Sequence, residues 1–346
     1  QLYCEAMTDN AYTKQPNDAT QNIGNGSYST ADPYVKKVWD GRYTGIRMCN
    51  ELLENIDRVP DLDPELKKRY IGEAKVLRAY NYYELYTKFG DVPYTTKVLS
   101  IKESMSIART AKATVIANVL ADLDEVINGN YLPTSYDADN KGRITRWAAM
   151  AIKAKIYLFE GNWTQVKNIT STIMTEGGFK LFGSYAGLFE IANEYNSEVI
   201  LDAQYRPTSR EHQMMYVFLP PTLGGYSQLS PLQELVDSYI MLDGKTIKET
   251  GTSFDESHPY ANRDPRLKAT VMYTGNSYTL ADGTEVVINC EKGEGKDGYG
   301  VGSDCSATGY YIKKYWDNTY RATLYSGLNP ILIRYADILL MNAEAL

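Results

Sequence analysis

The first half of the chain is a succession of helical patterns separated by short turns, and this feature constrains the fold more than any other. Apolar residues recur there at three- and four-residue intervals, which is the spacing of one helix face. The segments are residues 34–58, 64–88, 112–128, 145–161 and 163–175. Small and aromatic residues alternate along them, so residues 34–176 are predicted to form a tetratricopeptide-like scaffold without strict repeat spacing.

Capping residues mark the ends of these helices. Asp63 is a good N-cap, Pro64 suits the first helical position, and Glu65 suits the first turn. Gly90 is expected to end the same helix. Thr145 is expected to cap the helix over residues 145–161. That helix is dense in alanine and can therefore approach a neighbouring helix closely.

The pattern changes after residue 178. Residues 198–203 and 285–290 have the composition of short strands, and Asp282-Gly283 fits a hairpin turn. Long irregular stretches rich in Pro, Gly and Tyr lie between them. Loops of this length in a compact protein are usually functional or disordered, and the tyrosine and proline content favours ordered ones.

These patterns predict one mainly α domain over residues 1–346. It consists of a tetratricopeptide-like helical-repeat scaffold, a loop-rich irregular region with a few short strands over residues 178–330, and the start of a late helix over residues 331–346. We expect the loop-rich region to carry the ligand.

Composition and motifs exclude several classes of function. The net charge of −7 argues against a protein that neutralises nucleic-acid phosphates, and no apolar run approaches the ~20 residues of a membrane-spanning helix. Two His and four Cys without a C-x-x-C pair predict no zinc site. Residues 293–298 match G-x-G-x-x-G, but the glycines that follow cannot open a helix, so we expect a surface loop and no cofactor. No catalytic motif is present, and we expect no enzyme.

The cysteines leave two alternatives open. Cys290 and Cys305 flank a glycine-rich stretch and could pair in an oxidising compartment, or all four cysteines could be free.

Tyrosine is unusually frequent, with 30 Tyr against 7 Phe and 4 Trp. A tyrosine is favoured where its ring is dry and its hydroxyl is wet. Residues 9–34 and 205–228 are loops that combine tyrosines with Asn, Asp, Gln and Arg. Sugar rings stack an apolar face on aromatic planes, and their hydroxyls hydrogen-bond to such polar side chains. These loops are therefore predicted to bind an oligosaccharide.

The candidate ligand-binding residues are Tyr12, Asn22, Tyr28, Tyr34, Tyr205, Arg206 and Tyr226. Asp9, Asn25, Arg210 and Tyr216 belong to the same two loops. The alternative interpretation, that the tyrosines only pack the loops onto the helices, stays open.

Several sequence blocks, in order along the chain, resemble the SusD/RagB family of outer-membrane nutrient-binding lipoproteins. The segment with the strongest likeness is EAKVLRAYNYYELYTKFGDVPY, residues 73–94. The further blocks are residues 39–50, 143–163, 234–244 (ELVDSYIMLDG), 262–267 (NRDPRL), 310–315 (YYIKKY) and 333–345 (IRYADILLMNAEA).

The resemblance implies a non-catalytic cell-surface protein that binds glycans, or in some members peptides. It also implies a partner, a TonB-dependent transporter of the SusC type, on the extracellular face of the outer membrane. The family's lipidated N-terminal cysteine and its C-terminal part are expected to lie outside this chain. Cys4 lacks the small preceding residue of a lipidated cysteine.

The family blocks name no ligand residue and are interpreted as packing. Ala74 and Ala79 are expected between helices, Gly90 and Pro93 at a turn, and Arg78 buried and paired. A peptide-binding member of the family, a glycoside hydrolase and a pure scaffold that holds a protein partner remain the alternatives.

Overall fold

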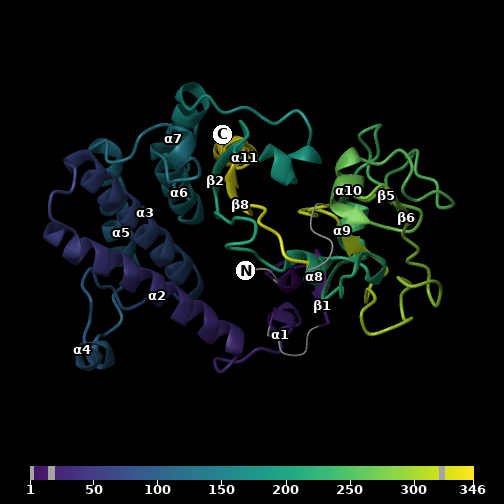
Figure 1. Cartoon of the computed structure of the whole chain (residues 1–346), viewed down its shortest axis with the longest axis horizontal. Helices are drawn as coiled ribbons and strands as arrows, with labels where there is room; N and C mark the ends of the chain where they lie inside the picture. Colours follow the sequence, from purple (N-terminus) through teal and green to yellow (C-terminus); the bar gives the residue numbers. More distant parts are fainter. Residues whose placement is uncertain (1–3, 15–19, 319–323) are drawn as a thin grey trace. The chain divides into compact units, whose positions relative to one another are not determined.

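The computed structural model describes residues 4–14, 20–318 and 324–346 (Figure 1). The chain divides into two compact units. The loop-rich unit comprises residues 1–34, 182–194 and 204–330, and the helical unit comprises residues 35–181, 195–203 and 331–346. Residues 15–19 of the first predicted binding loop lie outside the described residues.

The helical unit contains most of the long helices. Its helices are α2 (Pro33–Asn55, from residue 35 on), η2 (Ile56–Arg58), α3 (Pro64–Phe89), α4 (Ile101–Ser106), α5 (Lys112–Asn128), η3 (Ala138–Asn140), α6 (Arg146–Phe159), α7 (Trp163–Glu176) and α11 (Tyr335–Ala345). Its strands are β2 (Val199–Asp202) and β8 (Ile331–Arg334), which pair antiparallel.

The five helices predicted over residues 34–175 are confirmed, and so are the caps predicted at Asp63, Gly90 and Thr145. The Asp63 carboxylate accepts a hydrogen bond from the Leu66 amide at the start of α3, and the Thr145 hydroxyl accepts one from the Ala148 amide at the start of α6. Gly90 ends α3 with a φ of +67°, a conformation that glycine adopts without steric cost.

Neighbouring helices of this unit pack in sequence order. α3 packs on α5, α5 on α6, α6 on α7, and α7 on α11 (Figure 1). Apolar side chains from each of them form one core. Fully buried members of that core are Tyr82, Leu85, Val119, Leu123, Ala151, Ile152 and Ile156.

Arg78 lies inside this core, as predicted. It is 4% exposed, and its Nε and Nη2 donate to Asp122 Oδ2 at 3.0 and 2.7 Å. Its Nη1 donates to Asn50 Oδ1 at 2.9 Å. The residue therefore links α3 to α5 and α2.

The prediction of a helix over the whole of residues 331–346 is wrong at its start. Residues 331–334 (ILIR) form β8, because β2 offers these residues an antiparallel partner from a distant part of the chain. Ile333 is 1% exposed in the core. The Asp337 carboxylate accepts from the Arg334 amide and starts α11 at Tyr335.

The loop-rich unit is built from short elements. Its helices are η1 (Cys4–Met7), α1 (Thr20–Gly24), η4 (Gly187–Phe189), η5 (Ile191–Asn193), α8 (Met214–Phe218), η6 (Pro221–Leu223), α9 (Gln233–Ser238) and α10 (Pro265–Thr270). Its strands are β1 (Ala11–Thr13), β3 (Leu229–Pro231), β4 (Val271–Met272), β5 (Ser277–Thr279), β6 (Glu285–Val287) and β7 (Tyr311–Ile312).

The strands pair antiparallel as β1 with β3, β4 with β7, and β5 with β6. The Asp282-Gly283 turn joins β5 to β6, with Gly283 at a φ of +82°, so the predicted hairpin is confirmed. The strand predicted over residues 285–290 ends at Val287. Residues 293–298 form turns without a helix, as predicted.

Arg263 explains why the NRDPRL block is a packing motif. Its buried guanidinium donates to the carbonyl oxygens of Val236, Tyr239 and Pro259. It thereby satisfies carbonyls at the end of α9. Asp264 accepts from the Arg266 amide and caps α10.

The four cysteines are free thiols, so of the two alternatives the structure has the one without a disulfide between Cys290 and Cys305. Cys290 and Cys305 are buried, and the Cys305 thiol donates to the Lys296 carbonyl at 3.3 Å. Among the described helices, none combines the length and the apolar character needed to cross a membrane.

Candidate functional site

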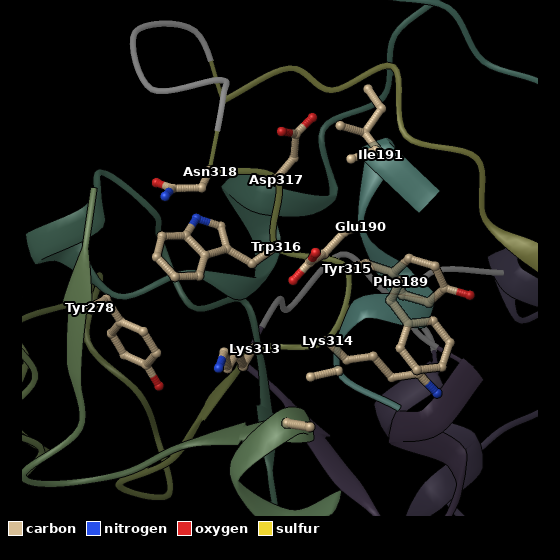
Figure 2. A pocket seen from close by; sticks show the side chains of 13 residues that line it. Phe189, Glu190, Ile191, Tyr278, Lys313, Lys314, Tyr315, Trp316, Asp317 and Asn318 are labelled. Atoms are coloured by element: carbon tan, nitrogen blue, oxygen red, sulfur yellow. The ribbon is translucent and has the colours of Figure 1, made fainter. Parts of the chain in front are cut away.

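A cavity of about 300 Å³ in the loop-rich unit gathers several aromatic side chains, and we call it the aromatic pocket (Figure 2). Residues 186–192 and 313–318 form most of its wall, and Ala269 and Tyr278 complete it. The volume lies at the lower end of the range of ligand-binding pockets.

Backbone pairing fixes the 313–318 segment. It follows β7, which pairs with β4, and the amides of Lys313 and Lys314 both donate to the Thr270 carbonyl. The Trp316 amide donates to the Lys313 carbonyl at 2.9 Å and closes a turn. Tyr315 within this turn has a φ of +66°, which is unfavourable for a residue with a side chain. Such strain is often found at binding sites.

Aromatic rings occupy two sides of the pocket (Figure 2). Trp316 and Tyr278 meet edge to face, with centroids 5.1 Å apart and an interplanar angle of 83°. Phe189 and Tyr315 meet with centroids 5.0 Å apart at 64°. Lys314 Nζ lies 4.2 Å from the Phe189 centroid, within cation–π distance.

Polar side chains also line the pocket. Lys313 Nζ is 5.1 Å from the Tyr278 centroid. Burial lowers the pKa of Lys313 and raises the pKa of Tyr278 above its usual range. Asn318 Nδ2 donates to the Thr279 carbonyl at 3.0 Å, while its buried Oδ1 has no hydrogen-bond partner among the residues that the structure describes.

Two carboxylates also line the pocket. Asp317 is 3% exposed and accepts from the Ser326 hydroxyl at 2.7 Å, whereas Glu190 is exposed. Aromatic faces beside donors and acceptors suit a ligand with an apolar face and a hydroxylated rim. In the part of the chain that the structure describes, no group of His, Cys, Asp and Glu residues could hold a metal ion.

The sequence-predicted residues of the first loop lie elsewhere in the loop-rich unit. Tyr12 is 37% exposed on β1, and its hydroxyl accepts from Gln21 Nε2 at 2.7 Å. Asn22 donates to the Asp32 carboxylate at 3.3 Å. Tyr28 is 56% exposed, and the Tyr34 hydroxyl lies 3.2 Å from the Cys4 thiol.

The second loop forms two aromatic contacts. Tyr205 meets the His212 ring edge to face at 4.8 Å, and the Arg210 guanidinium lies 5.4 Å from the Tyr205 centroid. Tyr226 is 38% exposed and stacks on Tyr216 at 4.2 Å and 28°. Arg206 is exposed at the start of the same loop.

The two predicted loops meet through their backbones, because β1 pairs with β3 and the Lys14 amide donates to the Gln228 carbonyl. None of the seven predicted residues lines the aromatic pocket. Sequence reasoning missed Trp316 and its neighbours, although the segment YWDN, residues 315–318, has the same mixture of aromatic, acidic and amide residues that selected the two loops.

Comparison with known proteins gives one consistent family. Residues 1–158 match the SusD-like_3 family model, described as "Starch-binding associating with outer membrane", and residues 187–346 match the SusD/RagB model of the SusD family. SusD-like protein P25 of Formosa agariphila is 32% identical over 211 residues, which are 58% of this chain and 40% of that protein. The chain spans 40% to 63% of the length of the curated relatives it matches.

Solved structures agree with this likeness. A SusD-like carbohydrate-binding protein from Bacteroides fragilis is 26% identical and superposes with a TM-score of 0.89, over 99% of this chain and 67% of that protein. A laminarin-binding SusD-like protein shares the fold with 24% identity and a TM-score of 0.77, over 99% of this chain and 74% of that one. These structures confirm the predicted fold class, mainly helical with a tetratricopeptide-like scaffold and a few short strands.

Proposed function

The chain belongs to the SusD/RagB family, and on that premise we propose that it captures an oligosaccharide in the aromatic pocket. It passes this ligand, uncleaved, to a TonB-dependent transporter of the SusC type in the outer membrane. A lipid anchor of the whole protein holds it on the extracellular face. The observation that carries the proposal is the half-buried indole of Trp316, set against Tyr278 in the pocket wall.

The names of similar proteins support the ligand class. One is called a carbohydrate-binding protein and another a laminarin-binding protein. A second cavity of about 360 Å³ shares Lys314 and Tyr315 with the aromatic pocket. Two cavities with a common wall suit an oligosaccharide better than a single sugar.

Weak binding fits this role. An aromatic stacking contact contributes about 1 kcal/mol. A few such contacts with hydrogen bonds, opposed by the ordering of the ligand, give dissociation constants of roughly micromolar to millimolar. A ligand held this weakly can be released to a transporter.

Native gels that contain a panel of polysaccharides test the proposal. We expect one polysaccharide to retard the protein and Trp316→Ala to weaken its binding about tenfold, equivalent to about 1.4 kcal/mol. Trp163→Ala is the matched control, because Trp163 is 45% exposed on α7 in the helical unit. An equal loss of polysaccharide binding in Trp316→Ala and Trp163→Ala, or no retardation by any polysaccharide, would contradict the proposal.

The seven loop residues remain a second proposed site, and the same gels compare the two. Tyr28→Ala and Tyr226→Ala should leave binding unchanged if the aromatic pocket holds the ligand. Loss of binding in these two variants, with Trp316→Ala unaffected, would place the ligand on the loops instead.

The absence of catalysis is tested with the retarding polysaccharide itself. We expect no new reducing ends after prolonged incubation. Release of reducing ends that disappears in Glu190→Gln would identify a glycoside hydrolase, in which two carboxylates share the reaction.

A further inference from the structure

Resting on the proposed glycan capture, we propose that the aromatic pocket selects glycans that carry an acidic group and that the ammonium of Lys313 binds this group. The group is an oxyanion on the sugar, either a uronate carboxylate or a sulfate ester. Lys313 is then a residue that determines specificity, while Trp316 supplies the stacking surface.

The first observation is that Lys313 lines the pocket but forms no ion pair with any described residue, although the charge of Glu190 acts on it from a distance. Its side chain is half-buried, and its ammonium lies on the same side of the pocket as Tyr278 and the indole of Trp316 (Figure 2). Among the described residues, no carboxylate lies within ion-pair distance of Lys313 Nζ and no hydrogen-bond acceptor contacts it. Its contact is the Tyr278 ring.

Other lysines of comparable burial behave differently. In the helical unit, the Lys75 ammonium pairs with Asp122 and Glu125, and Lys153 pairs with Asp124. Both lysine side chains are 15% exposed. A lysine removed from water generally has such a partner, because a desolvated charge is costly without one. Lys313 lacks this compensation.

A neighbouring positive charge adds to the cost of burying the Lys313 ammonium. Burial lowers the pKa of Lys313, and the positive charge of Lys268 lowers it further, while the charge of Glu190 acts in the opposite direction. An anion bound at the ammonium would offset both unfavourable contributions.

The two carboxylates of the pocket do not replace such an anion. Asp317 is buried, and its Oδ2 already accepts a hydrogen bond from the Ser326 hydroxyl. Glu190 is exposed, where water and salt screen its charge. Lys313 and Lys314 both line the pocket, and Lys268 lies close enough to lower the pKa of Lys313.

The turn that holds Trp316 also sets its separation from Lys313. The Trp316 amide donates to the Lys313 carbonyl, and both side chains contact Tyr278, one as a ring and one as a cation. A pyranose ring stacked at Trp316 therefore has the ammonium beside it, where an acidic substituent of the ring can bind.

The test begins with the polysaccharide that retards the wild-type protein in the gels above. We expect this polysaccharide to be acidic. Carboxyl reduction of a uronate glycan, or desulfation of a sulfated one, should weaken wild-type binding about tenfold or more, and the effective treatment identifies the group that binds. Lys313→Met should weaken binding of the acidic form equally and leave the remaining binding of the neutralised form unchanged. Lys313→Arg should retain most of the affinity.

Lys292→Met is the matched control, because it removes the same charge from an exposed loop outside the pocket. Thermal melting checks that each variant is folded. If Lys313→Met does not fold, the comparison of acidic and neutralised polysaccharide on the wild-type protein still decides. Retardation by a neutral polysaccharide, with Trp316→Ala defective, would overturn this inference and leave the proposed function standing. No retardation at all would overturn both.

Discussion

At the scale of single residues, Arg78 and Trp316 show two ways in which a side chain is held. Arg78 is satisfied inside the helical unit by Asp122 and Asn50. Asn50 in turn donates to the carbonyls of Thr95 and Lys97, so the network reaches the segment after α3. Trp316 instead stands in a cavity wall, with its ring available to a ligand.

Removal of the carboxylate of Asp122 should strongly destabilise the fold. In Asp122→Ala the guanidinium of Arg78 stays buried without its counter-charge, and such a loss costs about 3–5 kcal/mol. Asp124→Ala on the same helix is the control, because Asp124 is 43% exposed and its ion pair with Lys153 should contribute about 1 kcal/mol or less. Urea unfolding of both variants measures the difference. Similar losses would show that Arg78 finds another partner.

The two residues also differ in how far the sequence predicts them. Arg78 lies in α3, whose caps are local signals. Its burial and pairing are predicted from the likeness of residues 73–94 to the SusD/RagB family, whose blocks are interpreted as packing. The exposure of Trp316 to a cavity depends on the left-handed backbone of Tyr315 and on the pairing of β7 with β4. Neither is encoded by neighbouring residue types, because the composition of the segment permits many turns.

At the scale of elements, the helices are predictable because their start and stop signals lie within a few residues of their ends. Asp63 and Gly90 delimit α3 in this way. The strand β8 gives no such signal, since its partner β2 lies more than a hundred residues earlier in the chain. The sequence alone therefore predicts residues 331–334 as the first turn of a helix, and only the pairing with β2 shows that they form a strand.

Gly90 and Gly41 should respond to alanine with opposite signs. Gly90 has a positive φ with open space around it, so Gly90→Ala should cost about 1–3 kcal/mol from backbone strain alone. Gly41 is exposed within α2, again with open space, so Gly41→Ala should gain about 1 kcal/mol of helix stability. Urea unfolding measures both. A destabilised Gly41→Ala would mean that α2 is constrained by a contact other than its helical propensity.

At the scale of the whole molecule, the chain passes several times between its two units. Each unit is assembled from three separate segments, so neither corresponds to one stretch of sequence. The residues of the aromatic pocket nevertheless all belong to the loop-rich unit, in segments 186–192 and 313–318 with Ala269 and Tyr278. Composition predicts that residues 178–330 carry the ligand, but the convergence of two segments more than a hundred residues apart is a tertiary property that composition does not contain.

Because all residues of the aromatic pocket belong to the loop-rich unit, a bound glycan should protect the backbone from hydrogen exchange in that unit. A ligand at one hundred times its dissociation constant stabilises the bound state by about 2.7 kcal/mol, which should slow exchange wherever local opening breaks the site. We expect slower exchange in peptides that cover residues 186–192 and 313–318, and unchanged exchange in α3, α5 and α6. Trp316→Ala at the same glycan concentration is the control and should lose the protection. Protection confined to residues 20–34 and 205–228 would instead favour the two tyrosine loops, because those segments contribute nothing to the wall of the aromatic pocket.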